Sequence, residues 1–234
     1  FCKLENHQRT GSFKERGARN ALQQLPTEQR TKGVIAASAG NHAQGVAYAA
    51  QVLGVKALVV MPEDASPYKK ACARAYGAEV VDRGVTAENR EEVARALQEE
   101  TGYALIHPFD DPLVIAGQGT AGLELLAQAG RMGVFPEAVL APVGGGGLLA
   151  GLATAVKALS PTTLLLGVEP EVADDARRSL EAGRLFRLEA PPRTRADGVR
   201  TLSLGEHTFP ILKEKADGIL VVSEEAILEA ERLL

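Results

Sequence analysis

Three features of the sequence predict an α/β fold built on parallel sheets. From residue 33 onward, short apolar runs alternate with longer amphipathic stretches, which is the pattern of βαβ units. The chain is 45% hydrophobic but only 4% aromatic, with no Trp. Its core must therefore be built from Ala, Val, Leu and Ile, as in a parallel sheet covered by helices. Its 234 residues suit one large domain or two modest ones.

The elements follow one another in a regular order. The expected strands are Val34–Ala37, Ala57–Met61, Glu79–Asp82, Ala104–His107, Ala138–Val143, Leu164–Val168 and Gly218–Val222. The expected helices are Asn41–Leu53, Ser66–Tyr76, Thr86–Thr101, Leu113–Ala129, Leu148–Leu159, Asp174–Ala182 and Glu224 onward. Two prolines in the stretch His107–Pro112 must interrupt regular structure. Both ends read as cut, because Phe1–Leu4 looks like the middle of a strand and no Gly or Pro ends the helical pattern Ser223–Leu234.

Charge and composition exclude several classes of function. A net charge of −4 argues against nucleic acid as the main partner, because phosphate backbones are bound by an excess of Lys and Arg. Cys2 and Cys72 cannot make a disulfide framework and suit a reducing compartment, so a cytoplasmic protein is expected. The uncharged stretch Ala138–Val156 is nearly long enough to cross a bilayer. A proline and four glycines break it, and a membrane role is rejected.

The turn after the first expected strand is rich in small and polar residues. In doubly wound sheets, ligands bind where strands end and helices begin. The turn Ser38-Ala-Gly-Asn-His-Ala-Gln-Gly45 lets a ligand approach the backbone, and Ser38 and Asn41 can hydrogen-bond at a helix N-terminus, which favours anions. The alternative is that Ser38 or Asn41 merely caps the helix. His107, elsewhere, is expected to satisfy a loop hydrogen bond, and Cys72 to pack within a helix.

Four consecutive glycines, Gly144, Gly145, Gly146 and Gly147, follow the strand Ala138–Val143. Each costs backbone entropy on folding, and a ring of N–H groups around a phosphate would compensate for that cost. The run is neither a Walker loop nor a G-x-G-x-x-G motif with a following acidic residue. The alternative, a tight turn with close strand–helix packing, needs one or two glycines rather than four.

Lys14 lies where a helix is expected to begin, in the small-residue segment Thr10-Gly-Ser-Phe-Lys-Glu-Arg-Gly17. A lysine at the positive end of a helix loses its proton more readily, which suits a nucleophilic amine. The alternative is a solvated surface lysine. A phosphate cradle, an amine nucleophile and an anion-binding turn together are what pyridoxal phosphate chemistry requires.

Long motifs in the right order resemble one enzyme family. The segment Lys3–Ala18 resembles the cofactor-lysine segment of the fold-type II pyridoxal-phosphate enzymes, the tryptophan-synthase-β-like group. Ser38–Gly45, Gly117-Gln-Gly-Thr120 and the tetraglycine are similar to the branch of serine/threonine dehydratases and serine racemases, in register from Phe1 to about Val222. The resemblance implies two doubly wound parallel-sheet domains. Residues 1–33 and 113–234 would form a large cofactor-binding domain, and residues 34–112 a small inserted one.

The resemblance also implies roles for single residues. Lys14 would carry pyridoxal 5′-phosphate as a Schiff base and, once released, act as the base at the substrate Cα. The residues expected around the cofactor are Phe13 beside its ring, Asn41 at its ring hydroxyl, Gly144 to Gly147 at its phosphate, and Gly198 near its ring. The residues expected at the substrate carboxylate are Ser38, Ala39, Asn41, His42 and Arg90.

A metal site is implied by the motif Gly167-Val-Glu-Pro-Glu-Val-Ala-Asp-Asp175. In racemase-like members, the residues that match Glu169, the carbonyl of Ala173, and Asp175 hold Mg²⁺ or Ca²⁺, and oxygen ligands suit such hard cations. The alternative is a capped helix start with Asp174 and Asp175 near the helix dipole.

Ala39 decides between two chemistries within the branch. Serine racemases usually carry a second Ser at this position, and racemisation needs a proton donor on each face of the substrate. Ala39 therefore favours a dehydratase that converts L-threonine to 2-oxobutanoate, or L-serine to pyruvate, with release of ammonia. The alternatives are a serine racemase with dehydratase side activity, a β-replacement enzyme of the cysteine synthase type, and a non-catalytic homologue that binds the cofactor or a phosphate. The family is commonly dimeric or tetrameric.

Overall fold

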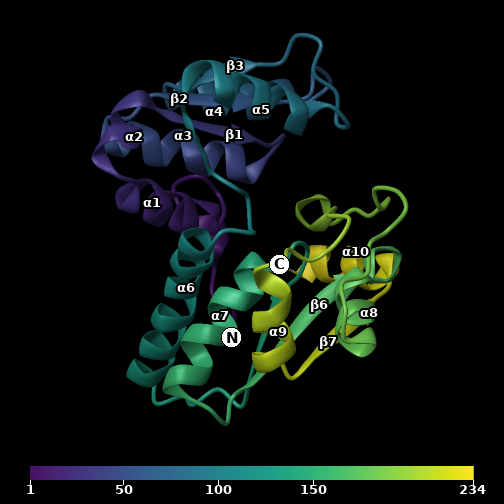
Figure 1. Ribbon diagram of the computed structural model, residues 1–234. Coiled ribbons are helices and arrows are strands. Elements are labelled where there is room, and N and C mark those ends of the chain that lie inside the picture. Colours follow the sequence, from purple (N-terminus) through teal and green to yellow (C-terminus); the bar gives the residue numbers. More distant parts are fainter. Residues whose placement is uncertain (234) are drawn as a thin grey trace. The chain divides into compact units, whose positions relative to one another are not determined.

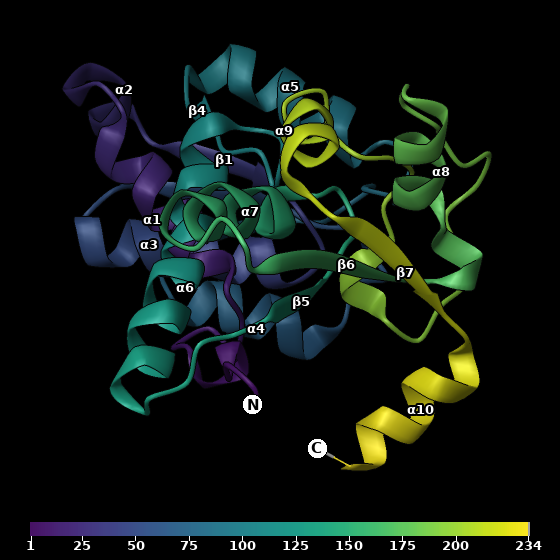
Figure 2. The ribbon, with the colours of Figure 1, turned by 90° about the horizontal axis from the view of Figure 1, so that it is seen from below.

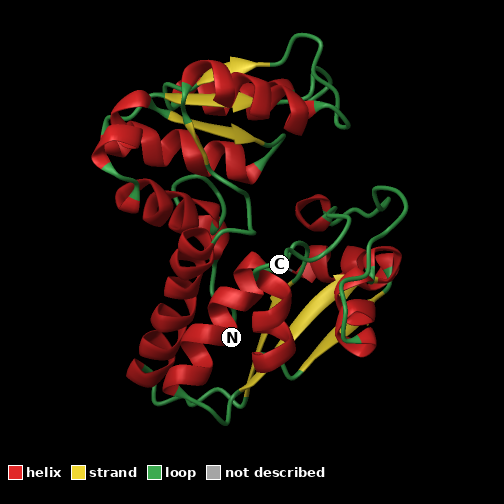
Figure 3. Ribbon diagram, in the orientation of Figure 1, coloured by secondary structure: helices red, strands yellow, loops and turns green. Residues whose placement is uncertain are grey.

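The computed structural model describes residues 1–233 and contains two compact units, residues 1–117 and residues 118–234. Within the described residues, seven strands form two sheets, and every strand pair is parallel. Figures 1 and 3 show both sheets with the helices that accompany them. The α/β class with parallel sheets is thereby confirmed, as is the order of its strands along the chain.

The first unit contains the four-stranded sheet, in the order β3-β2-β1-β4. Its strands are β1 (Val34–Ala37), β2 (Ala57–Val60), β3 (Glu79–Val81) and β4 (Ala104–Leu105). Its helices are α1 (Lys14–Gln24), α2 (Thr27–Lys32), α3 (Asn41–Leu53), α4 (Pro67–Ala75) and α5 (Arg90–Thr101), with a 3₁₀ turn at Glu5–His7. Val34, Ala36 and Val59 pack into one buried cluster with residues of α1 and α3. Ile35, Leu58 and Val60 belong to a second cluster with residues of α5. Both faces of this sheet are therefore covered, as a parallel sheet requires.

The second unit contains the three-stranded sheet β5-β6-β7. Its strands are β5 (Ala138–Pro142), β6 (Leu164–Pro170) and β7 (Gly218–Val222). Its helices are α7 (Gly147–Leu159), α8 (Asp175–Ala182), α9 (Thr208–Lys215) and α10 (Glu224–Leu233), with 3₁₀ turns at Glu171–Ala173 and Asp197–Val199. Helix α6 (Pro112–Arg131) begins in the first unit and ends in the second. Figure 2 shows α10 following directly from the end of β7.

Some boundaries differ from the expected ones, for local reasons. Helix α5 begins at Arg90 rather than at Thr86, because residues before it form a side-chain turn. In that turn, Asn89 Oδ1 accepts the N–H of Thr86 at 2.7 Å, and Thr86 Oγ1 accepts the N–H of Asn89 at 3.3 Å. Strand β4 ends at Leu105 rather than at His107, where the loop hydrogen bonds of His107 begin. Helices α2 and α9 were not expected.

The fold positions the motifs at the ends of strands. The Ser38–Gly45 turn follows β1, and the tetraglycine follows β5. The assignment of residues 1–33 to the same domain as residues 113–234 stays a prediction. In the part of the chain that the structure describes, no helix is both long and apolar enough to cross a membrane.

Candidate active site

Lys14 is the first residue of α1, as expected, and its amine is held by the backbone. Its Nζ donates a hydrogen bond to the carbonyl oxygen of Pro108 at 2.7 Å and lies 5.2 Å from the centroid of the Phe13 ring. Desolvation by burial lowers the pKa of Lys14 from its ordinary value of 10.5 to about 8. A larger fraction of this amine is therefore unprotonated near neutral pH than of a surface lysine. This is the condition that a nucleophilic amine needs.

Contacts on both sides of Lys14 fix the start of α1. The Arg16 guanidinium donates to both carboxylate oxygens of Glu5, at 2.7 and 2.9 Å, which is the geometry of a strong bidentate pair. The Glu15 carboxylate accepts the N–H of Thr10 at 2.9 Å. Helix α3 packs directly against α1 (Figure 1), and a Cβ built on Gly45 would lie 3.0 Å from the carbonyl carbon of Lys14. A residue larger than glycine at position 45 would therefore press on the backbone of Lys14.

The turn after β1 leaves main-chain donors available for a ligand. Helix α3 begins at Asn41, and the residue before it, Gly40, has no side chain to cap the helix. The Ser38 Oγ accepts the N–H of Gly40 at 3.3 Å rather than an N–H of the helix itself. N–H groups in the first turn of a helix lack intrahelical partners and attract anions. The capping role that the sequence left open for Ser38 is therefore not observed.

His42 is buried in the first turn of α3 and is held in one tautomer. Its Nε2 lies 2.8 Å from the carbonyl oxygen of Ile106, and because a carbonyl can only accept, Nε2 carries the proton. The buried Nδ1 is then unprotonated and has no hydrogen-bond partner. Burial, followed by the charge of Lys14, lowers the pKa of His42 to about 3. The neutral ring has no second N–H for a carboxylate, so His42 could bind one only through its main chain.

The segment after β4 holds the side chains of both Lys14 and His42. The carbonyl of Ile106 accepts from His42, and the carbonyl of Pro108 accepts from Lys14. The ring of His107 shapes the segment, because its Nδ1 accepts the N–H of Asp110 at 2.8 Å and that of Phe109 at 3.3 Å. The loop role expected for His107 is confirmed. The two backbone carbonyls, in contrast, were not foreseen as part of the site.

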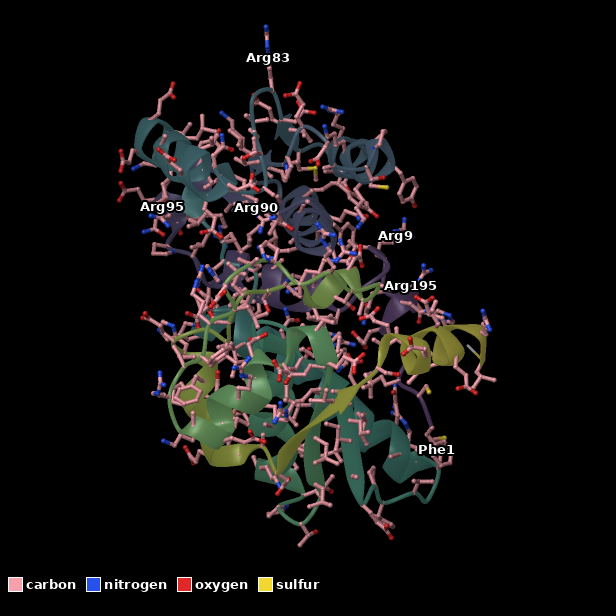
Figure 4. The ribbon with its side chains drawn as sticks, turned by 90° about the vertical axis from the view of Figure 1, so that its right-hand side faces the viewer. Phe1, Arg9, Arg83, Arg90, Arg95 and Arg195 are labelled. Atoms are coloured by element: carbon pink, nitrogen blue, oxygen red, sulfur yellow. The ribbon has the colours of Figure 1, made fainter. Side chains whose placement is uncertain are left out.

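Two cationic side chains are candidates for anion binding in the first unit. Arg90 is the first residue of α5 (Figure 4), and its side chain makes no hydrogen bond or ion pair with the described residues 1–233. Its expected role at the substrate carboxylate stays a prediction. Lys69, on α4, was missed because it reads as one of many surface lysines. A Cβ built on Gly40 would lie 3.7 Å from the Lys69 Nζ, so this ammonium group lies beside the turn after β1.

The tetraglycine of the second unit is a tightly packed loop at the start of α7. Gly146 adopts φ +89°, in the left-handed region that favours glycine, and Thr208 Oγ1 donates to the carbonyl of Gly145 at 2.7 Å. A Cβ on Gly144 would lie 3.0 Å from the Cα of Val199. Close packing therefore explains the glycines at 144 and 146. The loop also presents the N-terminus of a 13-residue helix with no acidic residue in its first turn, which suits a phosphate.

The residues expected beside the cofactor ring and at the metal lie in the same unit. Gly198 is exposed in the Asp197–Val199 turn, with nothing within 4 Å of its Cβ position. Glu169, at the end of β6, accepts the N–H groups of Ala176 and Arg177 at 3.1 and 2.9 Å. Glu169 therefore caps α8. The sequence had suggested Asp174 and Asp175 at this helix start instead.

Glu169 and Asp175 are both almost fully buried. Burial is the largest cause that raises the pKa of each carboxyl group to about 7, and Asp175 Oδ2 has no hydrogen-bond partner. Within the described residues, no three or more His, Cys, Asp or Glu side chains form a metal-binding group. The expected set has only two carboxylates, with the Ala173 carbonyl as its third member.

The lowered pKa of Lys14 makes a prediction about stability. In the cofactor-free protein, the unfolded chain binds more protons than the folded chain between the folded pKa of about 8 and the ordinary value of 10.5. Stability should therefore rise with pH across this window. We expect Lys14→Met to lose this rise. Relative to the wild type, the variant should therefore gain most stability below pH 8, and this gain should shrink toward pH 10.5. Urea unfolding of both proteins across this range measures the effect. A stability difference independent of pH would contradict it.

Comparisons with known proteins agree on one family. The family described as "Pyridoxal-phosphate dependent enzyme" matches residues 1–234. The crystal structure of a threonine deaminase from T.th. is 85% identical with a TM-score of 0.94, and the match covers 98% of this chain and 73% of that one. The L-threo-3-hydroxyaspartate ammonia-lyase of Saccharomyces cerevisiae is 46% identical over 234 residues, 100% of this chain and 70% of the relative. The structure of maize serine racemase is 40% identical with a TM-score of 0.93, covering 99% of this chain and 68% of that one.

Proposed function

Since this chain belongs to the pyridoxal-phosphate-dependent enzyme family, we propose that it dehydrates and deaminates L-threonine, and L-serine, to 2-oxobutanoate or pyruvate and ammonia. Its relatives include ammonia-lyases and racemases of amino acids. The observation that carries the proposal is the environment of Lys14, whose amine combines a pKa lowered to about 8 with a fixed position against the Pro108 carbonyl. Such an amine can both attack a carbonyl group and accept a proton.

The residues present fit pyridoxal 5′-phosphate. The bound cofactor supplies an electron sink that stabilises negative charge at the substrate Cα. Lys14 would hold it covalently through Nζ and, when free, accept the Cα proton at the same atom. Phe13 would lie beside the cofactor ring, and Asn41 would hydrogen-bond its ring hydroxyl. The remaining contacts would come from the tetraglycine Gly144–Gly147 at the phosphate and from Gly198 near the ring.

The substrate carboxylate would bind at the start of α3. The N–H groups of Ala39, Asn41 and His42 at this helix start, together with the hydroxyl group of Ser38, would form an anion-binding position. We assign His42 to this position by its main chain, because its ring is neutral and already donates to Ile106. Arg90 and Lys69 would add positive charge, which strengthens the selection of an acid over its neutral analogues.

Ala39 supports the dehydratase over the racemase. Its methyl group lies between Ser38 and Gly40 in the turn and cannot carry a proton to or from a substrate. Lys14 would then exchange the Cα proton on one face only. Without a proton donor on the other face, the substrate would lose its β-hydroxyl as water and would not be converted to the D-enantiomer.

Restoring a hydroxyl at position 39 should introduce racemisation. We expect Ala39→Ser to raise the rate of D-serine formation from L-serine by about 100-fold, the lower end of what one positioned proton donor contributes. Chiral chromatography of the products measures this rate beside 2-oxo-acid release. Ala39→Gly is the matched control, since it also changes the turn but adds no hydroxyl. Equal D-serine formation by the two variants would show that the hydroxyl is not what separates the two activities.

We also propose a divalent cation, Mg²⁺ or Ca²⁺, bound by Glu169, the carbonyl of Ala173, and Asp175. Support comes from the chemistry of the donors, because oxygen ligands suit hard cations. It also comes from the buried Asp175 Oδ2, which has no partner, and from the raised pKa of both carboxyl groups. A bound cation would keep the two groups ionised and anchor β6 to α8.

The decisive experiment uses the full-length protein, purified with pyridoxal phosphate. Its visible absorption band reports covalent attachment of the cofactor, and 2-oxo-acid release is assayed with L-threonine, L-serine and L-threo-3-hydroxyaspartate. We expect an absorption band and oxo-acid release, with L-threonine preferred. A band with release only from hydroxyaspartate would assign a different substrate, and a band with no oxo acid from any of the three would point to racemase, β-replacement or non-catalytic homologues. Absence of a band would contradict the role of Lys14.

The cytoplasmic location, the dimeric or tetrameric assembly and the domain division stay predictions.

A further inference from the structure

Thr201 carries a hydroxyl group that the protein itself does not use. Its Oγ1 is buried and has no hydrogen-bond partner among the described residues. Buried polar groups in folded proteins are nearly always hydrogen-bonded, and an exception calls for an explanation by a ligand, an ion or water. The backbone of Thr201 is fixed, because its N–H donates to the carbonyl of Val199 at 2.8 Å. The Thr201 hydroxyl is therefore a buried donor for which the described residues supply no acceptor.

The position of this hydroxyl links it to the tetraglycine. A Cβ built on Gly144 would lie 3.3 Å from Thr201 Oγ1 and 3.0 Å from the Cα of Val199. The segment that contains Thr201 thus packs directly on the first glycine of the loop. Both belong to the second unit, and Gly144 lies three residues before the first residue of α7.

Thr208 provides a contrast within the same loop. Its Oγ1 accepts the N–H of Gly205 at 2.9 Å and donates to the carbonyl of Gly145 at 2.7 Å. That hydroxyl is fully used in holding the glycine loop to the start of α9. Thr208 is therefore a structural residue, whereas the Thr201 hydroxyl remains available to a ligand.

The start of α7, three residues after Gly144, favours an anion. Gly146 precedes the helix and has no side chain to cap it, and the first turn contains no acidic residue. The N–H groups of the first turn and the positive end of the helix dipole therefore attract negative charge. A hydroxyl donor beside such N–H groups adds a further hydrogen bond to the same anion.

We propose that the Thr201 hydroxyl donates a hydrogen bond to the phosphate of the cofactor held at the tetraglycine. This inference rests on the proposed function, because it takes the ligand of the loop to be pyridoxal 5′-phosphate. No motif in the sequence indicated Thr201. It would complete a cradle whose other donors are main-chain N–H groups and so cannot be altered by substitution.

The test compares two ligands that differ only in the phosphate. The cofactor is removed from the full-length protein, which is then titrated with pyridoxal 5′-phosphate and, separately, with pyridoxal, and binding is measured by equilibrium dialysis. We expect Thr201→Val, which keeps the shape and removes the hydroxyl, to weaken binding of the phosphate ester about tenfold, as for loss of one hydrogen bond to a charged group. Binding of pyridoxal should not change, and Thr201→Ser should restore the affinity for the ester.

Controls separate this inference from its premise. Thr31→Val removes a hydroxyl that donates to the carbonyl of Glu28 on α2 and should change neither affinity. Urea unfolding checks that Thr201→Val is folded, and Thr201→Ala replaces it if it is not. Equal weakening of both ligands, or of neither, would overturn the role of Thr201 while leaving the cofactor assignment intact. A wild-type protein that binds pyridoxal as tightly as its phosphate ester would instead contradict the phosphate cradle itself.

Discussion

Replacing Lys14 by alanine is expected to abolish oxo-acid production and to remove the visible absorption band of the attached cofactor. The variant lacks the amine that would hold the cofactor and accept the Cα proton. A catalytic rate lower by about 10³-fold or more is expected, as for loss of a positioned acid–base group. The fold should survive, because the side chain makes one hydrogen bond, to the Pro108 carbonyl, and alanine is favourable at the start of α1.

The matched control for this variant is Lys56→Ala, which removes an exposed lysine from the loop before β2. Both proteins are loaded with pyridoxal phosphate, and their spectra and rates of 2-oxo-acid release are compared with those of the wild type. Lys56→Ala should keep both signals. If Lys14→Ala retained the band and released oxo acid at the wild-type rate, Lys14 would be neither the attachment point nor the base.

Replacing Gly117 by alanine is expected to destabilise the protein by about 2–3 kcal/mol, the upper part of the range for overpacking. A Cβ at this position on α6 would lie 2.6 Å from the carbonyl oxygen of Arg16 and 2.6 Å from the Cα of Gly17. Both are backbone atoms of α1, which cannot rotate away as a side-chain end could. Helix α1 would have to move, and it carries Lys14. We therefore also expect weaker cofactor attachment, measured by the visible band.

Gly130→Ala is a control on the same helix. Nothing lies within 4 Å of the Cβ position of Gly130, so the added methyl group has room. Alanine is favoured over glycine inside a helix by about 0.5–1 kcal/mol, and this variant should be slightly more stable than the wild type. Urea midpoints of the two variants measure the contrast. A similar midpoint for both would mean that the close approach of α6 to α1 is not tight.

Much of the fold could be predicted because its elements are locally encoded. Helix α3 begins at Asn41 and ends at Leu53 as expected, since Gly40 and Gly54 bracket an apolar periodic stretch. The start of α5 was missed because the hydrogen bonds between Thr86 and Asn89 compete with a helical turn. Helix α9 was missed because its short sequence Thr208–Lys215 contains Pro210 and little periodicity.

The candidate site was predictable in its motifs but not in its contacts. The sequence indicated Lys14 at the start of a helix, and the structure has it there. Its hydrogen bond to Pro108 joins residues 94 positions apart and is made to a carbonyl, a group that every residue possesses. The tautomer of His42 likewise depends on the Ile106 carbonyl, 64 positions away. Sequence patterns identify side chains, whereas such contacts exist only once β4 has paired with β1.

The carbonyls of Ile106 and Pro108 have a consequence for how this site can vary. Each is a peptide group, so exchanging the side chain at either position leaves the acceptor itself in place. Substitutions at positions 106 and 108 can therefore accumulate without removing the anchors of His42 and Lys14. Within such a scaffold, a change of substrate would require changes only at the residues that face the substrate. Relatives with different amino acids as substrates could then share one unaltered arrangement around the lysine.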